Sequence, residues 1–159
     1  MRTIVCLLVT AFALSVHVRD LRGTSAMPAQ AKPPSVIGSW RGDSICEGNH
    51  PACKNEDVVY RFEAIPGEPT SVSLFADKII NGKREAMGVL KFQYDEAKGT
   101  LSGEFTRRQT HGLWEFKIDG DTMAGTLVLL PDRTPGRRVK VKRVSEDQLP
   151  AAPPRESYQ

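Results

Sequence analysis

Cys46, His50 and Cys53 lie within eight residues of one another, close enough for thiol and imidazole chemistry. Such groups can form a disulfide or bind zinc, which would need a fourth ligand such as Asp57 or His111. Zinc sites prefer closer cysteine spacing and a reducing compartment, whereas an even pair of cysteines in an exported domain is typical of a disulfide. We therefore predict a Cys46–Cys53 disulfide, no metal and no cofactor, and keep the metal site as the alternative.

Catalytic motifs are sparse in this sequence. It contains no Gly-x-Ser-x-Gly turn for a nucleophilic serine and no glycine-rich phosphate cradle. Asp119 and Asp121 flank Gly120, which is the chemistry of a hairpin turn rather than of a paired acid and base. His111 is conceivable as a general base or metal ligand, although an exposed turn also accounts for it. We expect a protein that is not an enzyme, with catalysis through His111 or a metal as the alternative.

Several large apolar side chains could bind a ligand. Leu90, Phe92 and Tyr94 alternate along one segment, and Trp114 and Phe116 alternate along another. Because alternate residues of a strand share one face, each set points to one side of a sheet. These side chains are first of all expected in the core, and they are also our candidates for the lining of a ligand cavity.

Short β-strands are the elements that must position these residues. Apolar and polar residues alternate between turn sequences such as Asn81-Gly82, which favours a two-residue hairpin. Consecutive strands on short connections form an antiparallel meander, and closing it into a barrel removes the exposed edge strands. The fold class is therefore all-β, a small closed barrel of about eight strands. The expected strands are residues 36–45, 57–65, 70–80, 84–94, 100–106, 112–118, 122–130 and 137–144.

Gly38 and Trp40 open the first expected strand, and Arg143 ends the last, with Arg138 as the other candidate for that closing position. This pattern resembles the lipocalin/calycin superfamily, in which an arginine of the final strand packs on the tryptophan of a Gly-x-Trp motif. The resemblance implies a structural role for these residues at the closed end of the barrel. The chain is shorter than typical lipocalins and shows no C-terminal helix. The pattern also resembles small secreted bacterial proteins of uncharacterised function, with a Gly-x-Trp-x-Gly start and a cysteine pair.

The first residues of the chain are typical of a secretory leader. A basic start precedes an apolar run to Val18 that is short for a bilayer span, and small residues follow. We expect a signal peptide over 1–26, cleaved at Ala26 or as late as Ala31, with an uncleaved anchor as the alternative. A disordered spacer (27–35), one barrel domain (36–144) and a disordered proline-rich tail (145–159) then follow.

Cleavage changes the charge of the protein. Loss of Arg2, Arg19, Arg22 and Asp20 from 22 basic and 19 acidic residues leaves a net charge of +1. Binding to nucleic acid rests on many cation–phosphate contacts, so we expect no nucleic-acid partner. Arg138, Lys140 and Lys142 are interpreted as the solvated outer face of a strand whose Val139 and Val141 point inward. The alternative is that they bind an anionic lipid surface, lipopolysaccharide or an acidic partner.

The sequence predicts a secreted or periplasmic monomer with no stable membrane span after cleavage. Its expected function is the binding of a small apolar or amphipathic ligand, or of an envelope component. The alternative is a protein-binding module, such as a periplasmic hydrolase inhibitor. A ligand-binding protein requires an apolar, open-mouthed cavity of about 300 Å3 or more.

Overall fold

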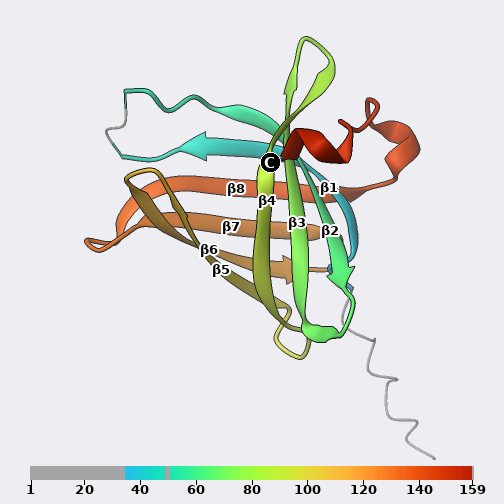
Figure 1. Ribbon diagram of the computed structural model, residues 1–159, viewed down its shortest axis with the longest axis horizontal. Coiled ribbons are helices and arrows are strands. Elements are labelled where there is room, and N and C mark those ends of the chain that lie inside the picture. Colours follow the sequence, from blue (N-terminus) through green and yellow to red (C-terminus); the bar gives the residue numbers. More distant parts are fainter. Residues whose placement is uncertain (1–34, 49–50, 159) are drawn as a thin grey trace, which may run out of the picture. The chain divides into compact units, whose positions relative to one another are not determined.

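Figure 1 shows the computed structural model of the chain, which describes residues 35–48 and 51–158. The predicted leader, nearly all of the predicted spacer and His50 lie outside the described residues. Eight antiparallel strands follow one another around a closed barrel, as the sequence predicts. The strands are β1 (Gly38–Cys46), β2 (Glu56–Ile65), β3 (Glu68–Ile80), β4 (Lys83–Asp95), β5 (Thr100–Arg107), β6 (Thr110–Asp119), β7 (Thr122–Leu129) and β8 (Thr134–Val144).

The register of β1 closes the barrel. Trp40 is the partner of Tyr60 on β2 and of Arg143 on β8, so the first strand joins the second to the last. The predicted hairpin between β3 and β4 has Asn81 and Gly82 at its tip. Their φ angles are 50° and 75°, the left-handed conformation that asparagine and glycine tolerate best.

β4 and β5 are paired over a much shorter length than the other neighbouring strands. Their ladder covers only Gln93–Asp95 opposite Thr100–Ser102, whereas β5 pairs with β6 along its whole length. At Gly103, where the ladder has ended, a Cβ atom would lie 2.8 Å from the carbonyl oxygen of Lys91. Beyond this close approach the two strands separate (Figure 1).

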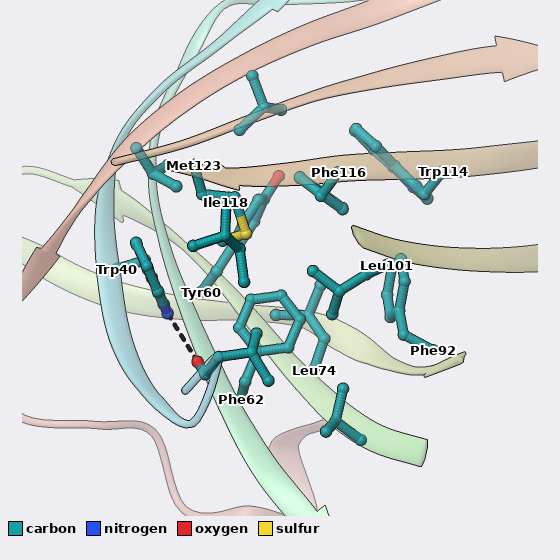
Figure 2. Close-up of a cluster of buried hydrophobic side chains, with 14 of the residues drawn as sticks. Trp40, Tyr60, Phe62, Leu74, Phe92, Leu101, Trp114, Phe116, Ile118 and Met123 are labelled. Carbon is teal, nitrogen blue, oxygen red and sulfur yellow. Dashed lines mark hydrogen bonds between the residues drawn. The ribbon is translucent and has the colours of Figure 1, made fainter. Parts of the chain in front are cut away.

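Aromatic rings fill the middle of the barrel (Figure 2). The Phe116 ring stacks on Trp114 at 5.5 Å between centroids, and it meets Tyr60 and Phe92 edge to face at 6.0 and 5.6 Å. A Cβ atom on Gly125 would lie 2.1 Å from Phe116, so only glycine leaves room for this ring. The alternation of inward apolar residues along each strand therefore produces one continuous core.

Trp40 and Arg143 close one end of the barrel, in the arrangement that the resemblance implies. The Arg143 guanidinium lies 4.2 Å from the centre of the buried Trp40 ring, and its Nη1 donates to the carbonyl of Ile37 at 3.0 Å. The indole of Trp40 donates to the carbonyl of Val36 at 2.9 Å (Figure 2). A cation–π contact and hydrogen bonds thus join the first and last strands. The other closing candidate, Arg138, is exposed and lies 3.5 Å from Glu47.

The C-terminal segment differs from its predicted disorder. Residues 146–148 and 155–158 form two 3-10 helices, η1 (Glu146–Gln148) and η2 (Arg155–Tyr158). The Tyr158 ring is buried and lies edge to face on Phe75 of β3, with 5.2 Å between centroids. The Arg155 guanidinium also lies over the Phe75 ring, 4.9 Å from its centre, and forms an ion pair with Glu63 at 2.8 Å. Packing on the outer face of β2–β4 therefore orders a segment that shows no periodic apolar pattern.

A buried ion pair attaches the start of this segment to the barrel. Arg84 and Asp77 have no exposed side-chain surface, and the Arg84 Nη2 and Asp77 Oδ2 atoms lie 2.6 Å apart. Arg84 Nη1 also contacts Glu146 Oε1 at 2.6 Å, and Ser39 donates to Glu146 Oε2 at 2.5 Å. Ions buried at this depth need such partners, so the network links β1, β3 and β4 to η1.

Candidate functional site

A pocket of about 350 Å3 opens into the barrel interior and reaches the gap between β4 and β5. It combines an apolar lining with polar side chains at one wall. A second depression is larger, about 770 Å3, but exposed side chains such as Glu115, Lys117 and Arg138 border it. Because small-molecule sites are concave and mostly apolar, the pocket within the barrel is the candidate site.

Three of the five predicted cavity residues line this pocket. Leu90 comes from β4, and Trp114 and Phe116 come from neighbouring inward positions of β6. Phe92 does not line it, because its ring is fully buried between Phe116 and Phe62. Tyr94 lies farther along β4, at the border of the second depression. The predicted set is therefore divided between the pocket, the core beneath it and the half-buried Tyr94 at the edge of that core.

Small and flexible apolar residues create the empty space. Leu74 and Ala76 on β3 face Leu90 and Gly88 on β4 in the ladder. Gly88 carries no side chain, and a Cβ atom there would meet nothing within 4 Å. Met87 adds a polarizable side chain that adapts to different ligand shapes. This wall therefore leaves room beside the packed aromatic rings.

The polar wall is formed by Ser44, Glu56, Tyr60 and Arg137, from the three consecutive strands β8, β1 and β2. Arg137 Nη1 lies 3.0 Å from Glu56 Oε2 and donates to Ser44 Oγ at 2.9 Å. Arg137 Nη2 donates to the carbonyl of Lys54 at 3.2 Å. In the circular order of the strands, β8, β1 and β2 lie across the barrel from β4 and β5, so the polar wall faces the two strands that separate.

Tyr60 contributes a neutral hydroxyl to this wall. Burial raises the pKa of its phenol well above the ordinary value, and the nearby Glu56 carboxylate adds to the increase. A hydrogen bond with Ser44 and the charge of Arg137 act in the opposite direction and are weaker. The Tyr60 hydroxyl therefore stays protonated at neutral pH and can donate or accept a hydrogen bond.

Sequence reasoning missed the polar wall, although a signal for it was present. Val139 and Val141 were expected to point inward, and period-two alternation puts Arg137 on that same face. The same rule places Glu56 on the face of Tyr60. The wall was missed because charged residues at strand ends are usually solvated. In addition, Ser44 contacts Arg137 through the register of β1 with β8, which the sequence does not show.

The mouth of the pocket lies where β4 and β5 separate. Val89, Thr106 and Arg107 are exposed there, and Tyr158 of η2 joins the lining. The C-terminal segment therefore supplies one wall of the opening. Arg107 is the charged residue of this mouth, and it lies in solvent, where water screens its charge.

Cys46, Cys53 and His111 are not among the residues that line the pocket. Cys46 and Cys53 form the predicted disulfide, with an S–S distance of 1.99 Å, so neither offers a thiolate to a metal ion. His111 Nε2 lies 3.2 Å from Glu104 Oε2, and their side chains are 45% and 62% exposed, respectively. The described part of the chain holds no group of three or more acidic, histidine or cysteine side chains placed for a metal ion.

Comparisons with protein-family models, with curated proteins and with solved structures give no match for this chain. None of the helices within residues 35–48 and 51–158 has the length and apolar character needed to cross a membrane.

Proposed function

We propose that this protein is an exported, non-enzymatic, lipocalin-like barrel that binds a small apolar or amphipathic ligand in the pocket between β4 and β5. The observation that carries the proposal is the pairing of an apolar lining with one polar wall in a single pocket of about 350 Å3. Ligand sites of this kind bury an apolar body and orient it through a few polar groups.

Two further features support the proposal. The Trp40–Arg143 contact closes one end of the barrel, and the pocket has its mouth at the side, where residues of β4 and β5 line it. The Cys46–Cys53 disulfide is consistent with an oxidising compartment, such as the periplasm or the extracellular medium. A periplasmic or secreted carrier of hydrophobic or amphipathic molecules fits both features.

Binding of the uncharged fluorescent probe N-phenyl-1-naphthylamine tests the proposal. We expect saturable fluorescence enhancement with the oxidised protein, and a large loss of affinity in Ala76→Phe, which puts a ring into the pocket. Ala124→Phe on the exposed face of β7 is the matched control and should bind as the wild type does. Circular dichroism of both variants checks that the barrel is intact, and Leu90→Trp provides a second way to fill the pocket.

Equal binding by Ala76→Phe, Leu90→Trp and the wild type would place the probe elsewhere and refute this function. Absence of binding by the wild type would do the same. The alternative of a protein-binding module would then be favoured if an envelope hydrolase were captured by the protein and lost its activity in the complex.

A further inference from the structure

The polar wall of the pocket contains one positive and one negative group in direct contact. Arg137 and Glu56 lie 3.0 Å apart, and their side chains are about one-fifth exposed. Each charge therefore compensates the other before any ligand arrives. A head group placed against this wall meets local dipoles and hydrogen-bonding atoms, but no net charge.

Charged head groups fit such a wall poorly. A carboxylate would approach Arg137 only beside the Glu56 carboxylate, which repels it, and an ammonium group would meet Arg137 in the same way. Either ion would also lose hydration on leaving water for a pocket with apolar walls. Neither cost is offset by a free counter-charge, because each charge of the wall already has its partner.

An uncharged head group fits the wall better. An alcohol or amide can donate to the Glu56 carboxylate and accept from Arg137 or from the Tyr60 hydroxyl, which burial keeps protonated. Hydrogen bonds to ionised partners are stronger than those between neutral groups. The hydration that such a head group loses is also much smaller than that of an ion.

We infer that the pocket selects amphiphiles with an uncharged, hydrogen-bonding head group, which lies against Glu56 and Arg137 while the apolar chain extends toward Leu90 and the β4–β5 opening. This inference rests on the proposed function and adds the class of ligand. Among the described residues that line the pocket, Arg107 is an exposed cation that could instead hold an anionic head group at the mouth, so the experiment must separate the two positions.

Displacement of N-phenyl-1-naphthylamine by three ligands of equal chain length measures the selectivity. We expect 1-decanol to compete about tenfold better than decanoate or decylammonium at pH 7.5. Glu56→Gln leaves the Arg137 charge uncompensated, so decanoate should gain about tenfold relative to decanol. Arg137→Met should favour decylammonium in the same way. Glu115→Gln, on the exposed face of β6, is the control and should keep the wild-type order.

Each outcome decides between the two proposals. If the probe binds but decanoate competes best with the wild type, the head-group inference is overturned while ligand binding stands. A decanoate preference that disappears in Arg107→Gln would place the head group at the mouth and overturn it as well. Unchanged selectivity in both Glu56→Gln and Arg137→Met, each shown to be folded by thermal unfolding, would also overturn the head-group inference. Failure of the probe to bind at all refutes the proposed function instead.

Discussion

Replacement of Asp77 by alanine tests how the buried ion pair supports the outer face of the barrel. Arg84 and Asp77 have no exposed side-chain surface, so the substitution leaves a guanidinium buried without its fully buried counter-charge. Removing one partner of a buried pair costs about 3–5 kcal/mol. Glu146 still contacts Arg84 at 2.6 Å, and half of its side chain is exposed. We therefore expect the lower end of the range, about 3 kcal/mol of lost stability.

Asp57→Ala is the matched control for this substitution. Its carboxylate lies 2.7 Å from Arg41, almost the same distance as in the buried pair, but the two side chains are 39% and 38% exposed. Exposed pairs contribute little because water screens the charges and the side chains lose entropy. We expect Asp57→Ala to cost about 0.5 kcal/mol. The distance between the paired charges is thus nearly the same at the two sites, whereas their burial is very different.

Urea unfolding of the oxidised protein, followed by tryptophan fluorescence, measures both losses. A double variant, Asp77→Leu with Arg84→Met, removes both charges and should recover most of the stability lost in Asp77→Ala, because an apolar pair can replace a buried ion pair. Equal losses in Asp77→Ala and Asp57→Ala would refute the reasoning. So would a double variant as unstable as Asp77→Ala, since the cost would then lie in the shape of the site.

Three further predictions concern the closed end, the disulfide and the C-terminal segment. Arg143→Ala should lower the free energy of unfolding by about 2 kcal/mol, because the cation–π contact and the hydrogen bonds are lost. The fluorescence emission of Trp40 should shift to the red, and unchanged emission would contradict the contact. Cys46→Ser with Cys53→Ser should cost about 2.5 kcal/mol in urea unfolding, from loop-closure entropy. Burial raises the pKa of Glu146, but the Ser39 hydrogen bond and Arg84 outweigh it, so the folded-state pKa is lowered. Its contribution to stability should disappear as the pH falls below the ordinary glutamate range, and Glu146→Gln should flatten that dependence.

The strand pattern could be predicted because period-two alternation is a local property. Each expected strand overlaps an observed one, and Asn81-Gly82 forms the turn that its residue types favour. The closing contact between Trp40 and Arg143 was also accessible, since it depends on two strand ends that a barrel must bring together. Local pattern and barrel closure thus account for most of the fold.

The order of the C-terminal segment could not be predicted in this way. Its attachment rests on isolated side chains, such as the Glu146 carboxylate, the Arg155 guanidinium and the Tyr158 ring, with prolines between them. Single contacts leave no periodic signal in the sequence. They stabilise the segment only because Phe75 and Arg84 lie on an outer face that an alternation argument assigns to solvent. Tertiary packing therefore orders a C-terminal segment for which composition alone indicated disorder.

One extra residue in β4 connects this outer face with the pocket. Ala76 pairs with Gly88, but the next residue of β3, Asp77, pairs with Ala86, so Met87 is the bulged residue. Strict alternation from Gly88 would put Arg84 on the inner face, whereas the bulge turns it outward beside Asp77. The same irregularity brings Met87 into the lining of the pocket. A single bulge therefore places Met87 in the lining of the candidate site and Arg84 in the buried ion pair behind it, which explains why neither placement could be read from the alternation of residues in the sequence.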